Sequence, residues 1–135
     1  MKEARAALYV KGYDLLLWLV RWAEKVPRGA RRFHADEILE AARAHLLACS
    51  LALSFSEGRL ARLQQADEAL VRLRLALRLA GDCGVLNDRN RHFLMPQLEE
   101  LGRMLGGWRK YEWAARRRYE QIEGEIGFQG ARSPE

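Results

Sequence analysis

Cationic and aromatic side chains near the end of the chain are its clearest candidates for chemistry. Residues 109–118 contain a single acid, Glu112, and five cations: Arg109, Lys110, Arg116, Arg117 and Arg118. Tyr111, Trp113 and Tyr119 lie among them. Because arginine binds phosphate oxygens and aromatic rings stack on bases, this segment is typical of a surface for single-stranded nucleic acid. Alternatively, the aromatic residues pack on a second subunit while the arginines face water, and both can hold on opposite faces.

A second group of arginines lies in a leucine-rich segment, residues 66–79. At helical spacing Arg74 and Arg78 share a face, whereas Arg72 lies well away from it. One interpretation is a solvated stripe with ion pairs to neighbouring acids. The other is phosphate binding, because a leucine-rich helix packed on both sides leaves its arginines to line a groove or pore. We favour phosphate binding and add Arg103 to the predicted contacts.

The residue types used in catalysis and metal binding are scattered along the chain. His34, His45 and His92 are far apart, and neither Cys49 nor Cys83 has a base beside it. HExxH and GxSxG motifs are absent, as is the Glu-x-x-His pattern of di-metal helical bundles. Adjacent acidic residues, as at 36–37 and 99–100, point in different directions on a helix. We therefore expect no catalytic activity, no metal site and no cofactor.

Composition indicates one helical domain with a basic surface. The 135 residues are 49% hydrophobic and 30% charged, and 23 Lys and Arg outnumber 18 Asp and Glu to give a net charge of +5. This length suits a single core, and the mixture is that of a folded amphipathic protein. The excess of arginine favours a polyanionic partner, although a merely basic surface explains the charge equally well.

Cysteine usage and hydropathy predict a soluble protein of the cytoplasm. Cys49 and Cys83 fall in or beside apolar helical stretches without CxxC spacing, which is typical of free thiols in a reducing compartment. The longest apolar run, residues 15–20, is far shorter than the ~20 residues that cross a bilayer. Glu3, Arg5 and Lys11 interrupt any signal-peptide core. We expect no membrane segment.

Apolar residues at steps of three and four predict four helices. Their expected ranges are residues 5–25, 32–53, about 57–80, and from Asn87 to about 126. Alternating Val, Ile and Thr runs are absent, so no strand is expected. The fold class is all-α, an antiparallel up-down-up-down four-helix bundle over residues 1–126, with a loose tail at 127–135. The last helix should outlast its neighbours by several turns.

Several residues mark the expected helix ends. Ser56 and Asn87 are predicted N-caps, and Gly81 and Gly84 are predicted to end the third helix. Pro96 should kink the fourth helix or mark a restart.

Three glycines, at 102, 106 and 107, lie in the fourth helical segment. Each costs ~1 kcal/mol relative to alanine in a helix, so a break near 106 is one interpretation. We favour the other, close approach of another backbone, since the apolar pattern continues past the glycines.

Five segments, in this order and spacing, resemble the accessory variability determinant (Avd) proteins of diversity-generating retroelements. They are GYDLLLWL at 12–19, KVPR at 25–28, the Ala-Asp start and Leu/Arg pattern of 66–79, DCGVL at 82–86 and ELGRMLGGW at 100–108. The resemblance covers residues 9–110. Helical proteins encoded by intervening sequences of bacterial ribosomal RNA genes share the fold.

This resemblance implies a homopentameric barrel of four-helix bundles with a basic surface and a central channel. It further implies a non-catalytic accessory protein that binds a reverse transcriptase and its RNA or DNA during mutagenic retrohoming. The rival hypothesis is a self-assembling scaffold of the ribosomal intervening-sequence type that acts through protein partners only.

Overall fold

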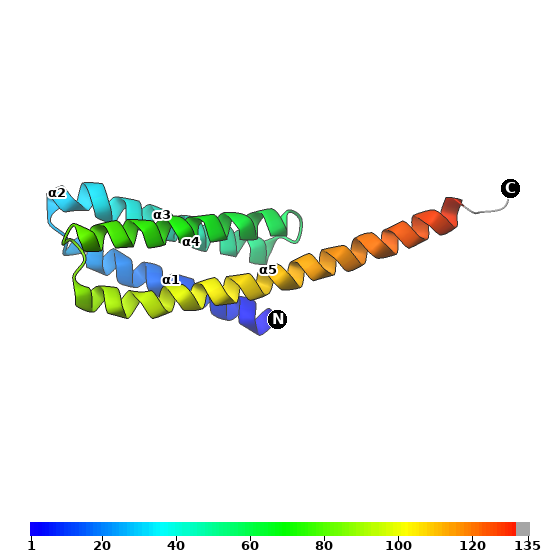
Figure 1. The fold of residues 1–135 in the computed structure, drawn as a ribbon, viewed down its shortest axis with the longest axis horizontal. Helices are drawn as coiled ribbons and strands as arrows, with labels where there is room; N and C mark the ends of the chain where they lie inside the picture. The colour runs from blue at the N-terminus through cyan, green and yellow to red at the C-terminus, as the bar shows by residue number, and fades with distance from the viewer. Residues whose placement is uncertain (132–135) are drawn as a thin grey trace.

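The computed structural model describes residues 1–131, apart from the side chains of Arg32 and residues 128–131. Its elements are α1 (Lys2–Glu24), α2 (Arg28–Ala30), the π-helical turn η1 (Arg31–Ala35), α3 (Asp36–Ser54), α4 (Arg59–Asp82) and α5 (Asp88–Ala131). Residues 1–131 contain no strand. The prediction of an all-α protein with four main helices is confirmed. Figure 1 shows these helices side by side, joined by short connections.

Leucine seams of α1, α4 and α5 form the core together with Ile38 and the small residues of α3. The largest fully buried side chains are Trp108, Leu8, Leu19, Ile38, Leu63, Leu70, Leu73, Leu77, Leu86, Leu94, Leu98 and Leu101. Small residues of α3, such as Ala41, Ala48 and Ala52, fill the space between them. Each buried leucine contributes roughly 2 kcal/mol. Burial of the leucines that recur at steps of three and four therefore supplies most of the driving force for the bundle.

The connection between α1 and α3 is more structured than the sequence predicted. Pro27 precedes the short α2, and η1 leads directly into α3, so helical structure begins at Arg28 rather than at residue 32. The Arg31 guanidinium donates hydrogen bonds to the carbonyl oxygens of Glu24 at 2.8 Å and Val26 at 3.2 Å. These bonds satisfy carbonyls at the end of α1 that have no helical partner.

The predicted helix ends are partly correct. Asn87 caps α5, because its side-chain oxygen accepts a hydrogen bond of 2.8 Å from the backbone N–H three residues later. At α4 the N-cap is Gly58 with φ +70°, not Ser56, because the tight turn from α3 needs a left-handed residue. Gly81 lies inside α4, and only Gly84, with φ +76°, adopts the left-handed conformation that ends it.

Helix α5 runs unbroken for 44 residues. It passes through Pro96 without a restart, and the glycines at 102, 106 and 107 do not break it. Where we expected a loose tail from Gly127, the helix continues to Ala131, because glycine weakens a helix without removing a backbone hydrogen bond. Residues 132–135 of the predicted tail lie outside the described residues.

The second half of α5 projects beyond the other helices (Figure 1). From residue 113 to 127 every side chain except the half-buried Ala115 is exposed. Little of α5 is covered within the subunit beyond Glu112, because α1, α3 and α4 are too short to accompany it. The prediction that this helix outlasts its neighbours is confirmed.

Candidate nucleic-acid interface

The three arginines predicted on α4 have different surroundings. The Arg72 guanidinium lies 3.2 Å from a carboxylate oxygen of Glu37 and 4.0 Å from one of Glu40, both on α3. These side chains are about half exposed, so the ion pairs are worth less than ~1 kcal/mol. Arg72 is thus directed toward α3 and away from the other two arginines.

Arg74 bridges α4 and α5. Its Nη2 atom donates a hydrogen bond of 3.2 Å to the carbonyl oxygen of Leu98. It lies over Gly102, where an added Cβ would be only 2.5 Å from Nη2. The close approach predicted at Gly102 is therefore made by a guanidinium rather than by a backbone. Within the subunit, Gly106 and Gly107 have open space beside them.

Arg78 and Arg103 differ in how free they are to bind an anion. Arg78 is exposed and forms no ion pair with any side chain that the structure describes. Arg103 forms an ion pair of 2.6 Å with Glu100 on the same helix. The hydrogen bond from Arg103 and the charge of Lys11 lower the pKa of Glu100, so this carboxylate remains ionised and competes with phosphate for Arg103.

An open cavity of about 450 Å³ lies between the start of α4 and the middle of α5. It is lined by Leu60, Gln64, Gly106, Arg109, Lys110 and Trp113. Arg109 is held on one side by Asp67 at 3.2 Å and by the side-chain oxygen of Gln64. Lys110 is exposed and has no ion pair among the described side chains. An indole beside a free ammonium can stack a planar base and bind its phosphate.

The remaining predicted cations lie on the projecting part of α5. Arg116 forms an exposed ion pair of 3.2 Å with Glu120, one turn later. Arg117 and Arg118 are exposed and unpaired within the part of the chain whose side chains are described. The nine predicted contacts therefore do not form one surface. Those without an ion-pair or hydrogen-bond partner within the described chain are Arg78, Lys110, Arg117 and Arg118.

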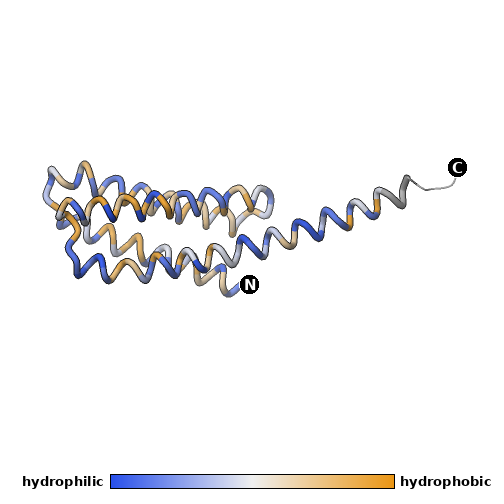
Figure 2. The backbone as a smooth tube through the Cα atoms, viewed as in Figure 1, coloured by the Kyte–Doolittle hydropathy of each residue, from blue (hydrophilic) through white to orange (hydrophobic). Residues whose placement is uncertain are grey.

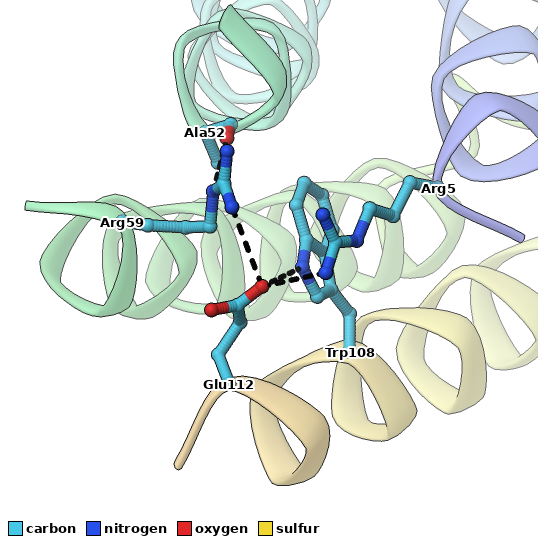
Figure 3. A network of polar contacts seen from close by, with 5 residues as sticks. All are labelled: Arg5, Ala52, Arg59, Trp108 and Glu112. Carbon is cyan, nitrogen blue, oxygen red and sulfur yellow. Dashed lines mark hydrogen bonds and ion pairs between the residues drawn. The ribbon is translucent and has the colours of Figure 1, made fainter. Parts of the chain in front are cut away.

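A network around Glu112 fixes the point where α5 leaves the bundle (Figure 3). One carboxylate oxygen of Glu112 accepts hydrogen bonds from Arg5 at 2.7 Å, the Trp108 indole at 3.1 Å and Arg59 at 3.5 Å. Arg59 also donates to the carbonyl oxygen of Ala52 at 2.6 Å, at the end of α3. The Glu112 carboxylate thus joins α1, α4 and α5, and Arg59 connects it to the end of α3.

Sequence reasoning missed this network and treated Glu112 only as the single acid among cations. The sequence contained one signal of this role: Glu112 follows Trp108 by four residues, so it occupies the next core-facing position of the apolar pattern. The Arg5 guanidinium also stacks over the Trp108 ring at 5.0 Å and the Tyr111 ring at 5.4 Å. Arg5 and Tyr111 are therefore used in packing.

A second basic group, also missed, lies at the other end of the bundle. Arg28, Gly29, Arg31 and Asp36 line an open cavity of about 410 Å³ at the start of α2. Arg31 serves mainly to cap α1, as described above. The signal in the sequence was the density of cations between residues 25 and 32.

One histidine and one cysteine are buried together between α3 and α4. His45 is 2% exposed, and its Nδ1 atom lies 2.9 Å from the carbonyl oxygen of Ala66. Its Nε2 atom lies 3.8 Å from the sulfur of Cys49. Burial lowers the pKa of His45 and raises the pKa of Cys49 to about 12, so both are neutral near pH 7.

Metal-ligand clusters and membrane-spanning helices are both absent from the described part of residues 1–131. Within that range no three His, Cys, Asp or Glu side chains converge as metal ligands would. None of the helices described there combines the length and apolar character that crossing a membrane requires.

Comparison of the chain with models of protein families, with curated proteins and with solved structures found no match in any of the three. The resemblance to Avd proteins therefore rests on the sequence segments alone.

Proposed function

We propose that this protein is a non-catalytic accessory subunit of a diversity-generating retroelement. In this role it binds the reverse transcriptase and its template RNA or cDNA in the cytoplasm and supports mutagenic cDNA synthesis. The observation that carries the nucleic-acid part is the cavity beside Trp113, where the unpaired Lys110 adjoins an exposed indole. Arg117 lies two turns farther along the same side of α5 and extends this basic surface.

The proposed assembly is an antiparallel up-down-up-down bundle repeated in a homopentameric barrel. Two exposed apolar stripes support it: Tyr9, Tyr13 and Leu17 on α1, and Val71, Leu75 and Leu79 on α4. Leu75 is 68% exposed. Two different uncovered stripes suit a ring, because each subunit can place its α1 stripe against the α4 stripe of the next. Light scattering should give about five times the 15.6 kDa chain mass, or a whole multiple of that value where rings associate, and a monomer at micromolar concentration would contradict the ring.

A second candidate, a scaffold that acts through protein partners only, is favoured by a different observation. Five of the nine predicted phosphate contacts already have partners within the subunit: Arg72, Arg74, Arg103, Arg109 and Arg116. Arginines held in this way stabilise helix contacts whether or not nucleic acid binds. A neighbouring reverse-transcriptase gene with a near-repeat of a target gene would favour the retroelement role over this one.

Matched pairs of substitutions test the binding surface. Lys110→Gln with Arg117→Gln removes two unpaired cations, and Arg72→Gln with Arg103→Gln removes two that are ion-paired. Fluorescence anisotropy with a short single-stranded RNA over a range of salt concentrations gives the slope of log affinity against log salt. We expect the first pair to flatten this slope by about 1.4, or ~0.7 per lost contact, and the second pair to change it little.

Undetectable RNA and DNA binding at low salt would contradict the nucleic-acid role and leave the protein-only scaffold as the better account. An equal effect of both pairs would reflect net charge alone, and it would contradict the assignment of the binding surface to Lys110 and Arg117.

A further inference from the structure

The projecting part of α5 carries the same seam as the packed part. Trp108, Glu112, Ala115, Tyr119, Ile122 and Ile126 follow one another at steps of four and three. The first two are covered by the bundle, whereas Tyr119, Ile122 and Ile126 are 62%, 55% and 63% exposed. Gly124 and Gly127 fall outside the seam. Figure 2 shows hydrophobic positions recurring among hydrophilic ones along the projecting part of α5, residues 113–127, which we call the arm. A seven-residue repeat of this kind is the pattern of a two-stranded coiled coil.

Charges on both sides of this seam are arranged in two halves. Arg116 and Glu123 flank one edge, seven residues apart, and Arg118 and Glu125 flank the other. On each edge the cation lies in the first half and the acid in the second. Among the described side chains Arg118, Glu123 and Glu125 have no ion pair. Glu123 is within hydrogen-bonding reach of the Tyr119 hydroxyl and raises its pKa, and Arg116 pairs with Glu120 on the exposed surface, so both can exchange these weak local contacts for an ion pair with another partner.

We propose that residues 115–126 pair antiparallel with the same residues of a second copy of this chain. In that arrangement Tyr119 packs on Ile122 of the partner subunit, and Ala115 packs on Ile126 of the partner subunit. The basic half of each helix then lies against the acidic half of the other. Arg116 faces Glu123 of the partner subunit, and Arg118 faces Glu125 of the partner subunit.

The charge pattern favours this direction over a parallel pair. A parallel, in-register pair brings Arg118 near Glu123 of the partner subunit, but it leaves Arg116 beside a tyrosine, Tyr111. The antiparallel pair forms twice as many ion pairs. Like charges do not meet in it, because the two-fold axis lies between the basic and acidic halves.

The bundle also has a cavity that can accommodate the end of the partner helix. A cavity of about 880 Å³ lies between the connection at residues 56–61 and the seam residues Glu112, Ala115 and Tyr119, with Arg116 at its edge. The antiparallel register brings Ile126 of the partner subunit opposite Ala115, at this cavity. The contact is separate from the apolar stripes of α1 and α4, so it is independent of the proposed ring.

Charge reversal in the full-length protein tests the pairing. Arg116→Glu with Arg118→Glu makes both halves acidic, and Glu123→Arg with Glu125→Arg makes both halves basic. We expect either variant alone to weaken self-association through the arm at least tenfold and to halve the particle mass measured by sedimentation. Mixing the two variants, or combining all four substitutions in one chain, should restore the wild-type mass. An unchanged mass for either variant alone overturns the proposal.

Disulfide trapping tests the direction. In a Cys83→Ser background, chains with Ala115→Cys mixed with chains with Ile126→Cys should form a mixed disulfide on mild oxidation. Ala115→Cys chains alone should not, and a disulfide between them would indicate a parallel pair and overturn the register. RNA affinity measured on the same charge-reversal variants distinguishes a second copy of the chain from RNA as the partner of this arm. If the acidic variant loses RNA binding while its mass is unchanged, the arm binds nucleic acid rather than a second copy.

Discussion

Arg5 and Glu112, which are 107 residues apart in sequence, form an ion pair of 2.7 Å that joins the first turns of α1 to α5. Their side chains are 19% and 16% exposed, so this pair and the Arg59–Glu112 pair are shielded far better than the other ion pairs of α5. Arg59 and the Trp108 indole donate to the same carboxylate oxygen. A single carboxylate thus holds the helix at the point where it leaves the bundle.

Replacing Glu112 with alanine should therefore destabilise the bundle. The substitution leaves the Arg5 and Arg59 guanidinium groups and the Trp108 N–H without their common acceptor in a half-buried site. We expect the free energy of unfolding in urea to fall by roughly 2 kcal/mol. Glu120→Ala is the matched control, because among the described side chains that carboxylate pairs only with Arg116 and both are exposed. Its effect should stay within about 0.5 kcal/mol, and equal losses for the two variants would contradict the network.

Two glycines of α5 should respond differently to alanine. Gly106→Ala adds a methyl group to open space within the subunit and should raise the free energy of unfolding by up to ~1 kcal/mol. Gly102→Ala gains the same helix propensity, but its Cβ displaces the Arg74 guanidinium from Leu98, and the lost hydrogen bond offsets the gain by about 1 kcal/mol.

A double-mutant cycle isolates this contact. In an Arg74→Gln background the two alanine substitutions should stabilise the protein equally, because the guanidinium is gone. A difference that persists there would mean that Gly102 is constrained by something other than Arg74. If Gly106→Ala instead lowers the particle mass in light scattering, Gly106 lies at a contact between subunits.

The sequence was sufficient to predict the helices because their core positions repeat. Leu94, Leu98, Leu101 and Leu105 recur at steps of four and three, and such a seam has one structural solution in water. The cap at Asn87 was predictable because it acts over three residues. The cap at Gly58 was not, since the choice between Ser56 and Gly58 depends on how sharply the chain must turn between two packed helices.

The partners of the arginines could be predicted only where they are local. The pairs Arg103–Glu100 and Arg116–Glu120 lie within one helical turn and follow from spacing alone. Arg72 pairs with Glu37, 35 residues away, and Arg109 with Asp67, 42 residues away. These pairs depend on which helices are neighbours and on their rotation. For this reason the sequence overestimated how many arginines are free for phosphate.

Burial of His45 should make stability depend on pH. Its imidazole is 2% exposed, and burial is the largest cause that lowers its pKa below the ordinary 6.5, with the nearby Arg74 charge acting in the same direction. The hydrogen bond to Ala66 and the charge of Asp67 oppose the shift without cancelling it. The unfolded chain therefore binds a proton at a pH where the folded chain does not.

The contribution of the neutral His45 to the free energy of unfolding should accordingly be fully present above the unfolded pKa of 6.5. It should be lost as the pH decreases below 6.5 toward the lower folded pKa. Urea unfolding at intervals between about pH 7.5 and 5.5, above the range in which most carboxylates titrate, should give a slope of at most ~1.4 kcal/mol per pH unit. His45→Asn should remove this slope, because an amide keeps a donor for the Ala66 carbonyl but does not titrate. His92→Asn, at an exposed position, is the control and should retain it. If the slope survives in His45→Asn, another group is responsible for it.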